Sequence, residues 1–276
     1  MMGDIYYLSG DGKRKIYLDR HPYWMQTGDI LDYEWDYTVR NKRIRGFDKD
    51  VAKREFLISI FGNSEEEYNS NWKHLHDVFE QDVRDLTPGR LYFGRYYLRC
   101  YIVASAKSEW ECDSGIVDNT LTLATDYPFW IQEASKQFFP QPDIVIESGF
   151  EYQYDYEYEY ASDTVGTVSW PTDHFASSEF LLIIYGPCSD PRLLINGYPY
   201  QVYDVLENND YMVIDSRENT VVKYLANGTT QNLYDMRAKE QSLFEKVPGG
   251  NLTVNWNAAF GFDLTLYLER SEPEWN

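Results

Sequence analysis

The chain has 276 residues and a net charge of −20, and 17% of its residues are aromatic, 25 of them tyrosines. This length predicts two domains, each with its own core, and the aromatic content favours sheets. The negative charge argues against nucleic acid and anionic membranes as partners, because both would be repelled.

Cysteine usage and the start of the chain bear on the compartment. Cys100, Cys112 and Cys188 are odd in number and spread out, which argues against a disulfide framework. We expect ordinary buried thiols, with the alternative that Cys100 and Cys112 face each other across a hairpin. There is no apolar run of about 18 residues and no signal-peptide pattern at the start. We therefore expect a soluble protein that is not secreted through a signal peptide.

The N-terminal part begins with strands. Residues 5–8 and 15–18 flank a Ser-Gly-Asp-Gly turn, a pattern typical of a hairpin. Residues 31–40 alternate strictly between apolar and polar, which predicts a strand with one buried and one solvated face. A basic loop follows, made by Arg40, Lys42, Arg43 and Arg45. It is either a solvated loop or a contact for an acidic neighbour.

A strand and one long helix form the centre of this part. Residues 56–61 are a continuous apolar strand, and Ser64 with Glu67 forms a capping box, which satisfies unpaired amides at the first helical turn. Proline disfavours helix in the residue before it, so Thr87-Pro88-Gly89 ends the helix. Apolar residues at helical spacing predict one stripe, made of Tyr68, Trp72, Leu75, Phe79 and Val83.

A β-hairpin and a connector complete the first domain. Strands are predicted at 91–103 and 120–125, and Tyr127-Pro128-Phe129-Trp130 closes the domain. Residues 138–142 (Phe-Phe-Pro-Gln-Pro) predict an extended connector, because each proline pushes its predecessor out of the helical region.

The domains are therefore expected at 1–138 and 139–276. They differ in charge, with 18 basic against 23 acidic residues in the first and 7 against 22 in the second. This difference favours an assembly part whose less charged half packs against copies of itself, while the acidic half stays solvated.

The C-terminal half predicts a β-sandwich. In residues 151–160 tyrosines and acidic residues nearly alternate, giving either a strand with one tyrosine face or a mobile acidic segment. The Asn-Gly pairs at 196–197 and 227–228 predict hairpins, because both residues tolerate the positive φ of a type I′ turn. Further strands are predicted at 179–185, 211–215, 252–256 and 262–268, and a short helix at 234–244. Short strands at this spacing indicate a sandwich.

No catalytic constellation stands out. The four histidines are His21, His74, His76 and His174. His74 and His76 are two apart on the helix and cannot share a metal. No Gly-x-Ser-x-Gly elbow, phosphate-binding glycine loop or Cys-x-x-Cys pair appears. A glycosidase pair of carboxylates is the remaining catalytic hypothesis, but 45 acidic residues single out no pair. We predict a protein that is not an enzyme and has no catalytic residues, cofactor or metal.

Two binding hypotheses remain. The aromatic residues Trp170, Tyr200 and Trp256 could stack on sugar rings, which makes a carbohydrate-binding sandwich the alternative function; large aromatics also fill cores. A loop offers oxygen ligands for calcium without the regular spacing of a calcium loop, which favours a solvated turn. Its residues are Asp204, Glu207, Asn208, Asn209 and Asp210.

Several short phrases follow one another across nearly the whole chain. The N-terminal ones are Trp35, Asp77-Val78-Phe79-Glu80-Gln81-Asp82-Val83, Pro88-Gly89-Arg90-Leu91-Tyr92, Tyr97-Leu98-Arg99-Cys100-Tyr101-Ile102 and Tyr127-Pro128-Phe129-Trp130. The C-terminal ones are Tyr185-Gly186-Pro187-Cys188-Ser189-Asp190-Pro191, Ile214-Asp215-Ser216 and Val247-Pro248-Gly249-Gly250-Asn251. In their order and spacing they resemble the distal tail proteins of long-tailed bacteriophages and prophages.

This resemblance implies a mainly β fold, with an α+β N-terminal domain and a galectin-like C-terminal sandwich. It also implies a hub at the virion tail tip, assembled in the cytoplasm of the bacterial host. There a homo-hexameric ring of N-terminal domains joins the tail tube protein to the tail-associated protein (tail lysin or fibre), and the C-terminal domain points outward, towards a receptor-binding protein or a host glycan. The family carries no catalytic motif and no short sequence motif for its ring contacts.

Overall fold

The computed structural model describes most of the chain, namely residues 3–107, 116–140 and 166–274. Cys112 and the tyrosine-rich segment 151–160 lie outside the described residues. Within them the protein is mainly β, with α1 (Glu65–Arg84) as its single α-helix, which confirms the predicted fold class. No described helix is both long and apolar enough to span a bilayer.

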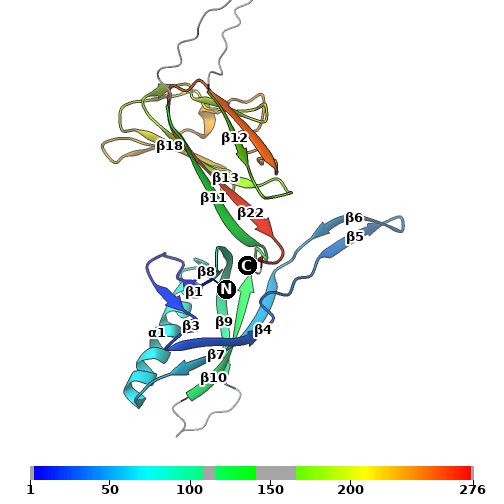
Figure 1. Ribbon diagram of the computed structural model, residues 1–276, viewed down its shortest axis with the longest axis vertical. Coiled ribbons are helices and arrows are strands. Elements are labelled where there is room, and N and C mark those ends of the chain that lie inside the picture. The colour runs from blue at the N-terminus through cyan, green and yellow to red at the C-terminus, as the bar shows by residue number, and fades with distance from the viewer. Residues whose placement is uncertain (1–2, 108–115, 141–165, 275–276) are drawn as a thin grey trace, which may run out of the picture. The chain divides into compact units, whose positions relative to one another are not determined.

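The chain folds into two compact units (Figure 1). The first unit comprises residues 1–132 and 269–276, and the second unit comprises residues 133–268. Each unit has its own cluster of buried apolar side chains. Each unit is therefore organised around a hydrophobic core of its own.

This division differs from the single boundary expected at residue 138. Residues 130–138, for which no strand was predicted, form strand β11 (Trp130–Phe138), and β22 (Phe262–Arg270) extends beyond the strand predicted at 262–268. Both strands have residues in each unit, so residues 133–138 group with the second unit and residues 269–276 return to the first.

Antiparallel strands form the sheets of the first unit. Their bounds are β1 (Ile5–Leu8), β2 (Lys15–Tyr17), β3 (Asp19–Arg20), β4 (Tyr23–Gly28), β7 (Ala52–Phe61), β8 (Gly89–Phe93), β9 (Tyr96–Lys107) and β10 (Ile116–Thr125). The order is β3-β4-β7-β10-β9, and β8, β1 and β2 continue from β9. The hairpin predicted at the start of the chain is confirmed by the β1–β2 pairing.

The predicted strand at 91–103 is wrong in one respect, because a tight turn divides it into β8 and β9. Phe93 pairs with Tyr96, so only Gly94 and Arg95 form the turn. Gly94 has a φ of 58°, a conformation that glycine adopts without steric cost. A single glycine inside a run of aromatic residues was too weak a signal to predict this hairpin.

The N-terminus of α1 is capped largely as predicted. The Ser64 hydroxyl accepts a hydrogen bond from the Glu67 backbone N at 3.1 Å. The Glu67 carboxylate accepts from the Asn63 backbone N at 2.9 Å, one residue before the position that a capping box uses. Both side chains therefore satisfy backbone donors at the helix start.

The C-terminus of α1 has the two hydrogen bonds of a Schellman motif. The Leu86 N donates to the Val83 carbonyl at 3.3 Å, and the Thr87 N donates to the Asp82 carbonyl at 3.1 Å. This motif requires a left-handed residue after the helix, and Leu86 takes that position with a φ of 51°. Leucine is unusual there, because its Cβ disfavours this conformation.

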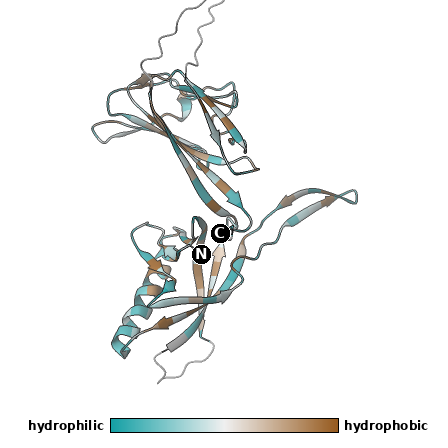
Figure 2. Ribbon diagram, viewed as in Figure 1, coloured by the Kyte–Doolittle hydropathy of each residue, from teal (hydrophilic) through white to brown (hydrophobic). Residues whose placement is uncertain are grey.

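The buried face of α1 is only partly the predicted stripe. Leu75 and Phe79 are buried as expected, but Trp72 and Val83 are each 37% exposed, and Val78 is fully buried. The helix contacts β7 and β9 along one side, which is consistent with the polar colours along much of it in Figure 2. The predicted stripe was therefore rotated relative to the face that packs.

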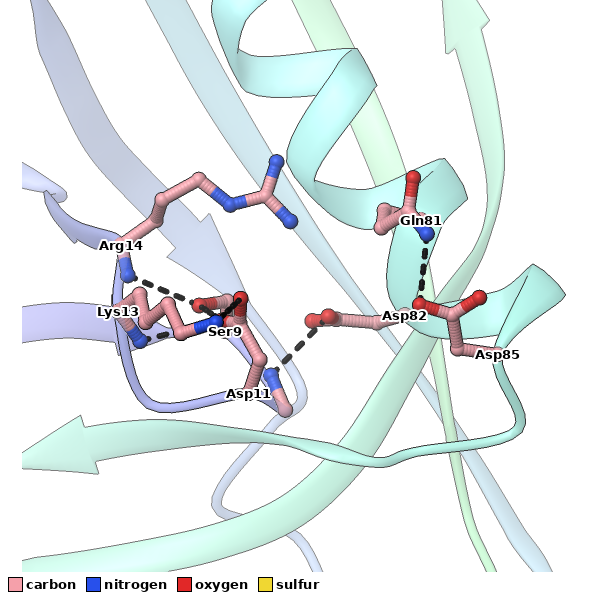
Figure 3. A network of polar contacts seen from close by, with 8 residues as sticks. Ser9, Asp11, Lys13, Arg14, Gln81, Asp82 and Asp85 are labelled. Carbon is pink, nitrogen blue, oxygen red and sulfur yellow. Dashed lines mark hydrogen bonds and ion pairs between the residues drawn. The ribbon is translucent and has the colours of Figure 1, made fainter.

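Asp82 is a carboxylate on the buried side of α1, with 3% of its surface exposed. Its Oδ2 accepts from the Tyr7 hydroxyl at 2.8 Å, and its Oδ1 accepts from the Gly10 backbone N at 3.0 Å. Burial raises the pKa of this carboxyl, and the two hydrogen bonds oppose that rise. Figure 3 shows Asp82 pointing from the helix towards the turn that carries Ser9 and Asp11. This contact ties the end of α1 to the β1–β2 hairpin.

The second unit is a sandwich of two antiparallel sheets. Its remaining strands are β12 (Gly166–Pro171), β13 (Glu179–Tyr185), β14 (Cys188–Ser189), β15 (Arg192–Ile195), β16 (Tyr198–Gln201), β17 (Val205–Leu206), β18 (Tyr211–Asp215), β19 (Thr220–Tyr224), β20 (Thr230–Asn232) and β21 (Asn251–Trp256). One sheet has the order β20-β19-β18-β13-β22-β11 and the other β12-β21-β15-β16, while β14 pairs with β17. Buried residues of both sheets form one core.

In the second unit the turn predicted at residues 196–197 is confirmed, but the helix predicted at 234–244 is not. Asn196-Gly197 joins β15 to β16 with φ values of 48° and 83°, as the type I′ turn requires. The helix predicted at 234–244 is wrong: only the 3-10 turn η1 (Tyr234–Met236) forms. Arg237 has extended backbone and bridges to Val202, which ends the turn.

Candidate assembly surface

A hairpin of two strands extends from the first unit (Figure 1). Its strands are β5 (Asp36–Arg40) and β6 (Arg43–Asp48), and we call residues 36–48 the arm. Arg40 pairs with Arg43, so Asn41 and Lys42 form a two-residue turn. Their φ values of 53° and 60° fit the type I′ turns that match the twist of a hairpin.

The arm packs against no other described strand. β5 and β6 pair only with each other, and nearly all of their residues are exposed. The prediction that residues 31–40 form a strand with one buried face is therefore wrong: only residues 36–40 are strand, and neither face is covered. The alternation defines two faces but cannot tell whether a layer of the same chain covers one of them.

One face of the arm is apolar. Tyr37 lies opposite Phe47, and Val39 lies opposite Ile44, and directly opposed residues of a strand pair share a face. These four side chains are 62%, 62%, 58% and 51% exposed, in that order. Apolar residues at this exposure on both strands make a continuous patch rather than isolated surface residues.

A β-bulge keeps that face continuous. Ile44 and Phe47 are three residues apart, which in a regular strand would place them on opposite faces. The register shifts by one residue between Thr38 and Val39, and such a shift absorbs one extra residue on the partner strand. Ile44 and Phe47 therefore point the same way despite their odd spacing.

The tip of the arm is basic. Residues 40–45 carry four positive and no negative side chains in a chain whose net charge is −20. Within the described residues, none of these four side chains makes an ion pair. The basic residues are Arg40, Lys42, Arg43 and Arg45. The arm thus combines an apolar face with an uncompensated positive end.

Lys49 fixes the base of the arm. Its Nζ donates to the Pro128 carbonyl at 3.1 Å and to the Ser271 hydroxyl at 3.0 Å. It also lies 4.8 Å from the ring centre of Trp35 and 4.4 Å from that of Phe129. Burial lowers the pKa of the Lys49 ammonium to about 8, while the ring faces favour its charged form.

This base also holds the returning C-terminal segment. Ser271 contacts Lys49, and Glu274 pairs with Arg95 at 2.6 Å. The Tyr127 hydroxyl is hydrogen-bonded to the Glu269 carboxylate. The predicted closing phrase at residues 127–130 therefore lies where the arm, the C-terminal segment and β11 meet within the first unit.

A cleft of about 200 Å³ lies at the same place. Its lining includes both acidic and basic side chains, among them Asp32, Glu34, Asp50, Lys53 and Arg54. Within the described residues, no group of three or more His, Cys, Asp or Glu side chains is arranged to hold a metal ion.

The residues proposed to bind sugar do not form one open surface. Tyr200 and Trp256 are 2% and 1% exposed and belong to the core of the second unit. The Tyr200 hydroxyl donates to the Glu245 carbonyl, and the Trp256 indole N donates to the Phe260 carbonyl. Trp170 is partly buried against the same core, so only part of one of the three rings is accessible.

Lys223 of strand β19 places its ammonium against the loop considered for calcium. The Lys223 Nζ lies 3.1 Å from an Asp204 oxygen and 3.8 Å from an Asp210 oxygen. It also donates to the Val205 carbonyl at 2.6 Å. Asp210 further accepts from the backbone N of Glu207 and of Ala226. These carboxylates are therefore used in holding the loop.

Three side chains of this surface were missed by the sequence analysis. Phe47 and Ile44 lie in a basic segment where no strand was expected. Lys49 carries no motif, because the rings around it come from segments that are distant in sequence. The local signal that could have predicted β6 was a second alternation of apolar and polar residues at 43–48, which the bulge interrupts.

Comparison with known proteins was made by sequence and by structure. No family model matches the chain, and no curated protein matches it. Among solved structures, the chain is similar to the Dit protein of phage SPP1, described as a paradigm of the hub adsorption apparatus in phages that infect Gram-positive bacteria. That likeness has a TM-score of 0.61 at 9% identity and covers 96% of this chain and 99% of the other.

The chain is also similar to a chain of the phage P2 baseplate in its activated conformation. With calcium the TM-score is 0.63 at 15% identity, covering 99% and 100% of the two chains. With strontium it is 0.61 at 15% identity, covering 98% and 99%. At these identities the likeness concerns the fold, and it confirms the fold expected from the resemblance to distal tail proteins.

Proposed function

We propose that this protein is a structural component of a phage tail tip, a distal tail protein. The observation that carries the proposal is the likeness of nearly the whole chain, both units included, to the SPP1 Dit protein and to a phage P2 baseplate chain. The order of sequence phrases supports it independently.

In this proposal six copies form a ring through the first unit, which corresponds to the domain expected at residues 1–138. The ring joins the tail tube protein to the tail-associated protein and to the host-adsorption apparatus. A head-to-tail contact closes into a ring when its rotation allows. The arm supports this part of the proposal, because an exposed apolar patch rimmed by polar residues is typical of an interaction site. The second unit, with its galectin-like sandwich, is placed on the outside, and the protein itself is not an enzyme.

Two measurements test the proposal. Electron microscopy and light scattering of the purified full-length chain, alone and mixed with the tail tube and tail-associated proteins of the same phage, are expected to show six-membered rings. Antibodies against the chain are expected to label the tail tip of intact virions. A strict monomer under all these conditions, together with unlabelled tails, would contradict the proposal.

Sugar binding is the less supported function. Two of the three rings considered for it lie in the core of the second unit, and stacking on a sugar needs an accessible ring face. A glycan array with the full-length chain is expected to give no signal that depends on Trp170. A signal that Trp170→Ala abolishes would restore this alternative.

A further inference from the structure

The arm lacks, within its own unit, the support that a hairpin normally needs. An isolated two-stranded hairpin is at best marginally stable in water, and a third strand or another packed layer is usually required. Within the part of the chain that the structure describes, the arm pairs with no third strand, and its apolar side chains are more than half exposed. A partner that covers this face would supply the missing layer.

The spacing of the apolar side chains indicates a docking face. Tyr37, Val39, Ile44 and Phe47 share one side, although the bulge has to absorb an extra residue to keep them together. The opposite face carries Thr38 and Gly46, with the charged ends of the strands around them. An arm that only needed solubility would gain nothing from this segregation.

Charge favours a second copy of this chain as the partner. Residues 40–45 carry four positive charges, so the rest of the chain carries −24. A second copy of this chain therefore carries an excess of acidic residues that the tip can complement, and complementary charge favours encounter and fixes register. The same charge balance disfavours a basic partner such as a nucleic-acid-binding protein.

We infer that the arm docks on a second copy of this chain, with its apolar face against that copy and its basic tip on that copy's acidic surface. This inference rests on the proposed ring and specifies its contact. Lys49 serves as a positioning residue: it holds the base of the arm through the Pro128 carbonyl, the Ser271 hydroxyl and the surrounding rings. These contacts orient the base of the arm within a single copy of the chain.

Matched substitutions on the two faces test the inference. Val39→Glu and Ile44→Glu each place one carboxylate on the apolar face, and Thr38→Glu places the same group on the opposite face. All three change the charge by the same amount. We expect the first two to weaken self-association of the full-length chain about a hundredfold or more, because a charge buried in an apolar contact is costly, and Thr38→Glu to retain it. Equal effects at positions 38 and 39, or none, would overturn the inference.

A second pair of variants tests the basic tip. Arg43→Glu is expected to weaken self-association about tenfold, whereas Lys73→Glu, the same charge reversal on the exposed side of α1, is expected to change it less. A photo-reactive amino acid at Phe47 provides a direct readout. Crosslinks between two copies support the inference, and crosslinks only within one copy, or none, overturn it.

Failure of the inference can be separated from failure of the proposed function. If the wild-type chain forms rings that Val39→Glu and Arg43→Glu leave intact, the arm contact is wrong and the ring stands. If the wild-type chain neither forms rings nor labels the tail tip, the proposed function fails as well. Circular dichroism and thermal unfolding of each variant confirm that the body of the protein is folded.

Discussion

A carboxylate inside a core has to be held by donors, and Asp82 is held by two. The Tyr7 hydroxyl and the Gly10 backbone N each donate to one of its oxygens. Both bonds join segments that are more than seventy residues apart in sequence. The pair therefore fixes tertiary structure rather than local structure.

The substitution Tyr7→Phe tests this contact. It leaves one buried Asp82 oxygen without its donor, and we expect a loss of about 1–3 kcal/mol in the free energy of unfolding at pH 7. The lost hydrogen bond favoured the ionised carboxylate, so the pKa of Asp82 in the folded variant rises further. The difference from the wild type should thus shrink as the pH falls through that pKa. Urea unfolding at pH 7 and at pH 4 measures both effects, and a difference that grows in acid would contradict the assignment.

Leu86 occupies a conformation that suits glycine. Its φ is 51° at the left-handed position of the Schellman motif, and its side chain is 80% exposed. Leu86→Gly removes the steric cost of the Cβ and sacrifices little packing. We expect the free energy of unfolding to rise by about 0.5–1 kcal/mol. Leu86→Ala, which keeps the Cβ, is the control and should give no comparable gain in thermal unfolding.

At the scale of elements, the C-terminal segment acts as a clasp on the first unit. It contributes Ser271 to the Lys49 ammonium and Glu274 to Arg95 and Arg270. Because the segment follows β22, which belongs to the second unit's sheet, the first unit is completed only after the second unit has been synthesised.

Deletion of residues 271–276 removes this clasp and leaves β22 intact. We expect the deletion to lower the stability of the first unit by about 1–2 kcal/mol, since exposed ion pairs contribute little and the partly buried hydrogen bond to Lys49 contributes most. Limited proteolysis should show faster cleavage around residues 33–49. A chain ending at Glu274 serves as the control, and equal cleavage of both truncated chains would argue against the clasp.

Elements specified by local chemistry could be predicted from the sequence. The cap of α1 and the Asn-Gly hairpin between β15 and β16 depend on residues that are neighbours in sequence. The arm could not be predicted as an exposed hairpin, because alternation is the same whether or not another layer covers it. Its second strand was hidden by the bulge and by four basic residues. The buried side of α1 was misplaced for a related reason, since Asp82 reads as polar and yet packs inwards.

For the whole molecule, the uneven distribution of charge predicts how assembly responds to salt. The basic tip of one copy is attracted to the acidic remainder of another, which carries a net charge of −24. The acidic remainders of two copies repel each other. Salt at about 0.1 M screens exposed charges beyond about 10 Å. If the tip contact dominates, raising salt from about 50 to 500 mM should weaken self-association. Sedimentation velocity at several salt concentrations measures this, and stronger association in high salt would show that repulsion between acidic surfaces dominates instead.

The Arg43→Glu variant provides the control for that measurement. It reverses one charge of the tip, so the salt dependence of its self-association should be shallower than that of the wild type. An unchanged slope would place the responsible charges elsewhere on the chain.

Among the described strands, β5 and β6 pair only with each other, and nearly all of their residues are exposed, so substitutions within the arm are expected to disturb the hydrophobic core little. If the arm docks on a second copy as inferred, the choice of neighbour and the stability of the rest of the protein depend on separate stretches of sequence. Substitutions in the arm could then change which subunit is recognised while the fold is preserved. Transfer of residues 36–48 to a related protein is expected to transfer this recognition.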